Sequence, residues 1–482
     1  MIYFLSLLPI LLLVILSLAR GVKVAVLAGW AVTTLLFFYW GAGVNHYLGA
    51  LGVSLLTTLN ILMIVLGAVF LYNIMFRTGL IKQITHSLDT LHPSKEIRFF
   101  LLALGLTAFF EGVAGFGTPG AIVPLILMAM GFEAVLSVSV VLLFDGLFAL
   151  FGAVGTPILV GLQVPLGLTG EEVKAIGITA ALLVIPAGLL VLLLVFRMVA
   201  RQHGPLEHKR QVLVLYTFIA VPFLLFAWLA PELATVFGAL VMLGLSVLYL
   251  KKPKTKLDLR PWLPYAVLAL LLLLPKLFSP LRNWIGWELA FENLFGTDIR
   301  GAIKPLQSPL WPFIAVGLGV AYFKKSESLY LKEPLMKVVN VFVVLFPSVA
   351  IAQLMIYSGV EQPSMVLYIA RMLSQLGQAY VVLSPFVGVM GAFITGSTTI
   401  SNLVFGASQL QTALSLEIEP TLILALQLTG ATLGNAVCLF NIIAAASVAN
   451  IQNYRDILAN NLLPATLAAL LVGLLGMAIL LM

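Results

Sequence analysis

The sequence predicts an all-α polytopic membrane protein with about twelve transmembrane helices. It also predicts two re-entrant hairpins, segments that enter the membrane and turn back, placed in two inverted repeats. Three observations lead to this prediction: an extremely apolar composition, repeated apolar runs of bilayer-spanning length, and two long apolar segments interrupted by glycine and hydroxyl residues.

The composition indicates that lipid surrounds the chain. Hydrophobic residues make up 61% of the 482 residues, charged residues make up 9%, and the mean hydropathy is +1.12. A water-soluble domain carries about 25% charged residues. The single cysteine, Cys438, excludes a disulfide framework and a cysteine-ligated metal site. The net charge of +7 indicates no nucleic-acid partner, because the basic residues are confined to the polar joints between apolar runs.

Apolar runs of about 20 residues, enough to cross a hydrocarbon core of about 30 Å, recur along the chain. We expect spans at 2–19, 24–42, 49–76, 97–130, 133–155, 173–197, 211–230, 232–250, 262–278, 309–323, 335–357, 380–412, 419–450 and 458–481. No basic residue precedes the first run, so a retained span is expected there and not a signal peptide. The expected divisions are two N-terminal spans (1–48), a first repeat (49–250), linking spans and loops (251–334) and a second repeat (335–482).

Two of these runs, 97–130 and 380–412, are too long and too interrupted to be single helices. The first contains FEGVAGFGTPG and the second contains GAFITGSTTISN. If both are re-entrant hairpins, the joints on one face hold 20 of the 26 basic residues, in agreement with the excess of Lys and Arg in cytoplasmic loops. We therefore expect the first hairpin to enter from the cytoplasm and the second from the opposite face. Both termini are then expected outside the cytoplasm.

A weak internal repeat relates the two halves. MFRTGLI at 75–81 is echoed by MIYSGVE at 355–361, and GFGTP at 115–119 by TGSTT at 395–399, both with an offset of 280. An odd number of expected crossings separates the spans that precede the two hairpins, so the halves are predicted to be upside down relative to each other. Inverted repeats with interrupted helices near the midplane are the architecture of secondary transporters.

A further interruption follows each hairpin, LLFDGLFALFGAVGTPI at 142–158 and LALQLTGATLGNAVCLFN at 424–441. Non-helical backbone at membrane depth is tolerated only inside protein or beside a wet cavity. The four interruptions therefore predict one central cavity in which a solute would bind.

Of the 19 acidic residues, only Glu111 and Asp145 fall squarely within apolar segments. An ionised carboxylate costs several kcal/mol at the bilayer centre and is normally kept for proton relays, ion sites or substrate contacts. Both residues are therefore candidates for proton coupling. The alternatives are that Glu111 is a protonated cap of its own hairpin tip and that Asp145 simply bonds a neighbouring helix.

No Lys or Arg lies at depth in the predicted spans, so a transported anion would be held by backbone N–H groups and hydroxyls at helix N-termini. The interruptions supply such groups. The candidate substrate-binding residues are Gly115, Gly117, Thr118, Ser397, Thr398, Thr399, Ser401, Asn402, Asn435 and Asn441. The alternative is that the glycines allow close packing and the hydroxyls satisfy their own backbone.

The strings FEGVAGFGTPGAIVPLILMAMGF, FGAVGTPI, GAFITGSTTISNLVFG and GNAVCLFNIIAA resemble the L-lactate permease family of bacterial and archaeal carriers. The similarity runs in register over both halves. It implies proton-coupled uptake of lactate and glycolate by a two-hairpin fold like that of the wider ion-transporter superfamily, with the coupling acid at Glu111. The chain is a divergent member, because the family commonly has an amide at the position of Asp145, G-S-N-T at 396–399 and His-Asn at 440–441.

These features predict a secondary active transporter of the plasma membrane that couples protons to a small monocarboxylate such as L-lactate or glycolate. The alternative is a sodium-coupled carrier of another small organic anion, because carbonyls and hydroxyls at two tips also suit a hard cation. An anion channel is a further alternative, since re-entrant hairpins also build selectivity filters. An enzyme is not expected, because all five histidines lie in joints or near span ends, and no cofactor or metal is expected.

Overall fold

The computed structural model describes residues 1–89, 92–115, 117–250, 260–278, 280–281, 286–306, 308, 310–326 and 328–482. The helices are α1 (Ile2–Arg20), α2 (Val22–Tyr39), α3 (Val44–Arg77), α4 (Leu80–Asp89), α5 (Lys95–Leu101), η1 (Leu102–Leu106), α6 (Thr107–Val113), α7 (Thr118–Ala129), α8 (Ala134–Phe148), η2 (Ala149–Phe151), α9 (Gly152–Ile158), η3 (Leu159–Gln163), α10 (Val164–Leu166), α11 (Gly170–His203), α12 (Lys209–Leu229), η4 (Pro231–Leu233), α13 (Ala234–Leu250), η5 (Arg260–Trp262), α14 (Leu263–Leu277), η6 (Leu294–Gly296), α16 (Leu310–Phe323), α17 (Lys332–Ile356), α18 (Met365–Ser374), η7 (Gly377–Ala379), α19 (Tyr380–Thr395), α20 (Thr398–Ser415), α21 (Pro420–Asn435), α22 (Leu439–Val448) and α23 (Arg455–Leu480). Two strands, β1 (Leu289–Phe291) and β2 (Gly301–Ile303), pair antiparallel. Phe116 of the first hairpin motif lies outside the described residues. The basic run KKPKTKLDLR at 251–260 also lies outside them, except for Arg260.

The predicted class, a helical protein with many apolar spans, agrees with this structure. Within the described ranges, ten helices are long and apolar enough to cross a membrane. The expected crossings at 262–278 and 309–323 correspond to α14 and α16, which have 15 and 14 residues. Helices of that length reach only about 21–23 Å, less than the hydrocarbon core, so about twelve crossings stays a prediction.

The interruptions predicted in 97–130 and 380–412 are confirmed. In the first segment α6 ends at Val113 and α7 begins at Thr118, after Gly117 with a left-handed φ of 78°. In the second, Gly396 takes the same conformation between α19 and α20, with a φ of 75°. Glycine has no side chain and enters this region at little cost, so a glycine stands directly before α7 at the first turn and directly after α19 at the second.

Both segments also turn back on themselves. Phe99, near the start of the first, packs against Phe132 just past its end, with ring centroids 4.3 Å apart. At the base of the second, the hydroxyl of Tyr380 donates a hydrogen bond to Oε1 of Gln409. The hairpin shape is therefore present twice, and its placement in a bilayer stays a prediction.

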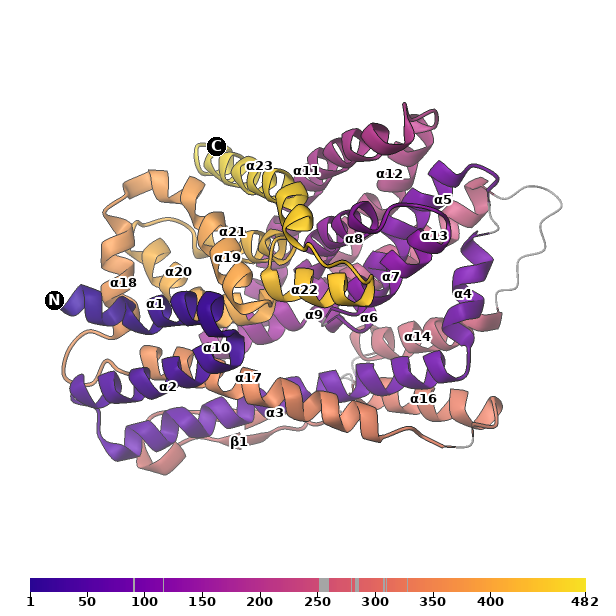
Figure 1. Ribbon diagram of the computed structural model, residues 1–482. Coiled ribbons are helices and arrows are strands. Elements are labelled where there is room, and N and C mark those ends of the chain that lie inside the picture. The colour runs from indigo at the N-terminus through magenta and orange to yellow at the C-terminus, as the bar shows by residue number, and fades with distance from the viewer. Residues whose placement is uncertain are drawn as a thin grey trace.

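Two groups of helices surround these hairpins. Figure 1 shows α1, α2, α3 and α17 side by side along one side of the molecule, with α16 packed on α3. We call α1, α2, α3, α16 and α17 the peripheral group. The hairpins and the interrupted helices lie between it and α11, α12 and α23 (Figure 1). The β-hairpin runs along α3, where Asn60 Nδ2 donates to the carbonyl of Ala302 at 2.9 Å.

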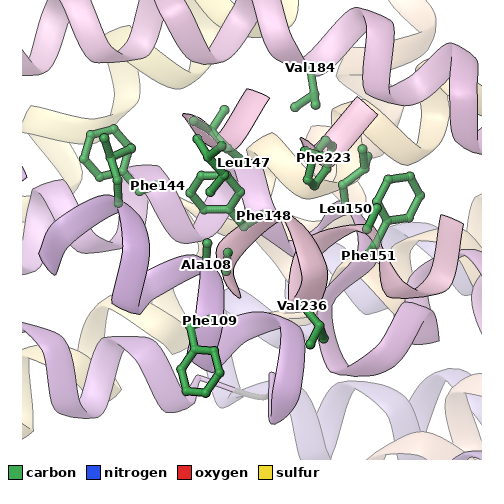
Figure 2. Close-up of a cluster of buried hydrophobic side chains, with 14 of the residues drawn as sticks. Ala108, Phe109, Phe144, Leu147, Phe148, Leu150, Phe151, Val184, Phe223 and Val236 are labelled. Carbon is green, nitrogen blue, oxygen red and sulfur yellow. The ribbon is translucent and has the colours of Figure 1, made fainter. Parts of the chain in front are cut away.

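A compact apolar cluster supports the break that follows α8, at η2 and α9; we call this break the first interruption, and the corresponding break between α21 and α22 the second. Figure 2 shows side chains from α6, α8, η2, α11, α12 and α13 gathered around the end of α8, among them Phe109, Phe148 and Phe223. Phe151 packs against Phe223 with ring centroids 5.4 Å apart. Close packing of this kind holds a non-helical segment in one conformation, because any movement would open voids in the cluster.

Two short amphipathic helices were not predicted, and they occupy equivalent places in the two halves. Helix α4 begins within the motif MFRTGLI, directly after α3, and buries Leu80, Ile81 and Ile84. After α17 and its motif MIYSGVE, α18 buries Met365, Val366 and Ile369, each 285 positions further along the chain. The burial pattern is shared by the two halves, although its offset is five residues longer than the offset of 280 that relates the two sequence echoes.

Candidate functional site

One cavity joins the four interruptions, as the sequence predicts. It has a volume of about 650 Å³. Gly117 from the first hairpin tip and residues 395–399 from the second line it. Ala149, Ala153, Thr156 and Pro157 line it from the first interrupted helix, and Asn435, Phe440 and Asn441 line it from the second.

Glu111 lies in the wall of this cavity. It occupies α6, just before the first hairpin tip, and is only 6% exposed. Its carboxyl group lies against Gly152, where an added Cβ would collide with Oε1 and come within 3.0 Å of Cδ. The space that the carboxyl occupies therefore depends on the missing side chain of Gly152.

Asp145 lies behind Glu111, outside the cavity lining. The two carboxyl groups interact directly, although they come from α6 and α8. The amide of Asn435 donates to Asp145 Oδ2 at 3.1 Å, and the amide of Asn441 donates to Asn435 Oδ1 at 2.6 Å. A continuous polar chain thus leads from the first half of the protein to the second. Two neighbouring carboxyl groups would repel each other if both were ionised.

The second hairpin tip uses several of its hydroxyls internally. Ser397 Oγ accepts a hydrogen bond from the backbone N–H of Ile400 at 3.3 Å and so caps α20. Thr398 Oγ1 lies 3.5 Å from the carbonyl of Ala431, and Thr395 Oγ1 donates to that of Gly391 at 2.8 Å. Ser397, Thr398 and Thr399 all line the cavity as well. Ligand contact and backbone satisfaction are therefore compatible there.

Ser401 and Asn402 lie elsewhere, in a buried polar network behind the tip. Gln427 Nε2 donates to Ser401 Oγ at 3.2 Å and to Asn402 Oδ1 at 3.3 Å. Asn402 Nδ2 donates to the carbonyl of Pro157 at 3.1 Å, which ties the second hairpin to the first interruption. Gly115 and Thr118 are likewise outside the lining, so substrate contact by these four residues stays a prediction.

The first interruption contains strained backbone. Ala153, Val154 and Gly155 follow one another with φ of 43°, 54° and 76°. Left-handed conformations cost roughly 1–2 kcal/mol for each non-glycine residue, and such strain concentrates at functional sites. An added Cβ at Gly155 would meet the backbone of Glu232, a third buried acid that the sequence analysis did not single out.

Comparison with known proteins identifies the family of the chain. A family model described as L-lactate permease matches residues 3–261 and 313–482. The chain belongs to the L-lactate permease family. Within the family it is similar to the L-lactate permease of Streptococcus iniae, with 28% identity over 75% of this chain and 79% of that one. It is also similar to those of Escherichia coli, with 26% identity over 82% and 80%, and Bacillus subtilis, with 26% over 78% and 76%.

In this L-lactate permease family member, three basic residues at the cavity mouth escaped the sequence analysis. Arg20 and Lys23 line the cavity from the turn between α1 and α2, and Lys337 lines it from the start of α17. The charge pattern assigned all three to joints that determine topology. The available signal was that both joints were expected on the same face of the membrane.

Proposed function

We propose that this chain is a proton-coupled symporter that carries a small monocarboxylate, such as L-lactate or glycolate, across the plasma membrane. The proposal rests on one observation above all. A buried carboxyl group, Glu111, lines a cavity shared by both hairpin tips in a member of the L-lactate permease family.

In this proposal Glu111 binds the coupling proton, and Asp145 shares it or receives it. Neutralising the carboxyl removes its repulsion of an incoming anion, so proton and anion each favour binding of the other. Such coupling is reciprocal by thermodynamic necessity. The polar chain through Asn435 and Asn441 supports the proposal, because it connects the acid pair to the cavity wall of the other half.

The anion would be held at the two tips. The N-termini of α7 and α20, which begin at Thr118 and Thr398, carry the positive ends of their helix dipoles. Cavity-lining hydroxyls and the amides of Asn435 and Asn441 supply further hydrogen-bond donors. Charge neutralisation by a side chain is then unnecessary at this depth.

The proposed topology has both termini outside the cytoplasm and hairpins that enter from opposite faces. Helix α11 supports it, because its 34 residues extend about 51 Å. At its end, His203 packs against Phe132 at the base of the first hairpin, with ring centroids 4.8 Å apart. Before its start, Leu162 and Leu166 lie against Gly406 on the second hairpin. The two hairpins therefore contact opposite ends of a helix that is long enough to cross the membrane, as entry from opposite faces requires.

Purified protein in liposomes tests the function directly. Labelled lactate, glycolate and a dicarboxylate are offered under separate proton and sodium gradients. Accumulation of a monocarboxylate driven by the proton gradient alone is expected. Accumulation driven by sodium would show that sodium, and not the proton, is the coupling ion. Flux without counterflow of labelled for unlabelled solute would indicate a channel.

Replacing Glu111 with Gln is expected to abolish accumulation driven by the pH gradient while exchange of labelled for unlabelled substrate continues. The amide fills the same space but cannot release a proton. Glu171→Gln, at an exposed acid in the first turn of α11, is the matched control and should behave as the unmodified protein. Accumulation that survives in Glu111→Gln would remove Glu111 from the coupling role.

A further inference from the structure

The mouth of the cavity carries a cluster of cations that the proposed coupling mechanism does not use. Arg20, Lys23 and Lys337 all line the cavity, and all three are exposed. The three salt bridges found in the described part of the chain, Arg77–Glu333, Arg300–Glu292 and Lys304–Glu288, involve none of them. Among the described residues that line the cavity, Glu111 is the only acid.

Helix α17 shows how this cluster relates to the rest of the cavity. Lys337, Asn340, Val341, Val344 and Leu345 line the cavity at helical spacing, so one face of α17 forms a wall. Exposure falls along this wall, from exposed Lys337 to Leu345 at 4%. The two ends lie about 12 Å apart at 1.5 Å per residue. The cations therefore mark the open end, and the hairpin tips lie further inside.

Membrane topology alone does not explain why these three residues line the cavity. A cytoplasmic joint needs basic residues but has no need to point them into a cavity. Lys332 lies in the same joint as Lys337, is also exposed, and does not line the cavity. Focusing of like charges at the mouth of a cleft raises the local concentration of an oppositely charged solute and its rate of entry by about 10- to 1000-fold.

We propose that Arg20, Lys23 and Lys337 form an anion-capture site, which binds the carboxylate of the substrate at the cytoplasmic mouth of the cavity, on the path between the cytoplasm and the hairpin tips. This inference rests on the proposed function, because it takes a small carboxylate as the transported solute. The site determines apparent affinity and salt dependence. It does not take part in proton coupling.

The test is uptake of labelled lactate by protein reconstituted in phosphatidylcholine liposomes with its cytoplasmic face outward, measured against lactate concentration at low and at high salt. In the variant Arg20→Gln/Lys23→Gln/Lys337→Gln, the KM at low salt is expected to rise about 10-fold with the maximal rate unchanged. The KM of the unmodified protein should rise with salt towards that of the variant, because salt screens charges beyond about 8–10 Å. Lys332→Gln is the matched control and should leave the KM unchanged.

A charge-restoration experiment checks that the sign of the charge is responsible. Lys337→Cys is prepared in a Cys438→Ser background and modified with a membrane-impermeant cationic or anionic thiosulfonate. The cationic adduct is expected to restore the low KM, and the anionic adduct is expected to raise it further. Equal effects of both adducts on the KM would overturn the inference, because the size of the adduct and not its charge would then determine the KM.

Other outcomes separate this inference from its premise. Transport of lactate by the neutralised variant with an unchanged KM and salt dependence overturns the capture site and leaves the proposed function intact. Failure of the unmodified protein to transport any carboxylate overturns both. A KM effect seen only in liposomes that contain anionic lipid means that the cations bind headgroup phosphates, and this also overturns the inference.

Discussion

Gly152 positions the coupling acid by lacking a side chain. A Cβ there would collide with Oε1 of Glu111, and the backbone at Gly152 has φ of −62° and ψ of 159°, which any residue can adopt. Gly152→Ala should therefore fold but push the carboxyl out of its position. Uptake driven by the pH gradient is expected to fall at least 10-fold, in agreement with a positional error of the order of 1 Å at a reacting group.

The control for this change is Gly244→Ala in α13, where no atom lies within 4 Å of the added Cβ. Uptake by this control should match that of the unmodified protein. A second readout, exchange of labelled for unlabelled lactate, should survive in Gly152→Ala as in Glu111→Gln. Normal pH-driven accumulation by Gly152→Ala would show that the position of the carboxyl is unimportant.

Single residues were predictable where their chemistry conflicts with lipid. Glu111 and Asp145 stand out in apolar runs, and the structure brings them together. Asn402 was a weaker prediction, because an amide serves a ligand and a buried network equally well. The mouth cations were missed, because the sequence indicated only that their joints share one face of the membrane, and not whether the side chains face solvent, headgroups or a cavity.

At the scale of elements, the second hairpin packs on α21 through glycines. An added Cβ at Gly430 would lie 2.6 Å from the Cα of Pro385, so the backbones of α19 and α21 touch there. We expect Gly430→Ala to lower stability by about 1–3 kcal/mol, the cost of forcing extra volume into a packed interface. The midpoint of thermal unfolding of the purified protein, together with lactate uptake, measures this effect.

A glycine-to-alanine change at an uncrowded helix position is expected to raise stability and therefore provides the control. Alanine is favoured over glycine in a helix by about 0.5–1 kcal/mol. Gly319→Ala in α16, where the added Cβ meets nothing within 4 Å, should therefore keep or raise the unfolding midpoint. If Gly430→Ala behaves in the same way, the close contact between the second hairpin and α21 is not needed.

Elements could be predicted from the sequence where their residues differ clearly from those of the surrounding apolar runs. Glycines and hydroxyls inside apolar runs predicted both hairpins and both later interruptions, since little else explains them at membrane depth. Helix α4 was missed because most of its ten residues are polar, and α18 because its ten residues are too few to cross a membrane. The β-hairpin at 289–303 was missed for a different reason: its three-residue strands pack on α3, a contact across more than 240 residues that no local pattern encodes.

On the scale of the whole molecule, the cavity lies where the peripheral group meets the hairpins. Its wall combines α17 and the α1–α2 turn from that group with tips and interruptions from the two halves. Carriers that alternate access expose one such site to each side in turn, and inverted repeats provide two related arrangements. The correspondence between α4 and α18 supports a repeat of this kind.

Opposite entry of the two hairpins can be tested by labelling. Glu133 and Ser415 are exposed residues just beyond the last helical turn of the first hairpin and at the end of the second. In a Cys438→Ser background, Glu133→Cys and Ser415→Cys should react with a membrane-impermeant thiol reagent from opposite sides of oriented vesicles. Glu133→Cys is expected to react from the cytoplasmic side, because Glu133 accepts a hydrogen bond from Gln202 beside the basic joint at 197–210.

Lys82→Cys, before the first hairpin, is the matched control and should react from the same side as Glu133→Cys. That result means that the chain enters and leaves the membrane on one face between residues 82 and 133. Reaction of Glu133→Cys and Lys82→Cys from opposite sides would make 97–130 a crossing segment. Reaction of Glu133→Cys and Ser415→Cys from the same side would leave both hairpins in place but would rule out the inverted relation between the halves.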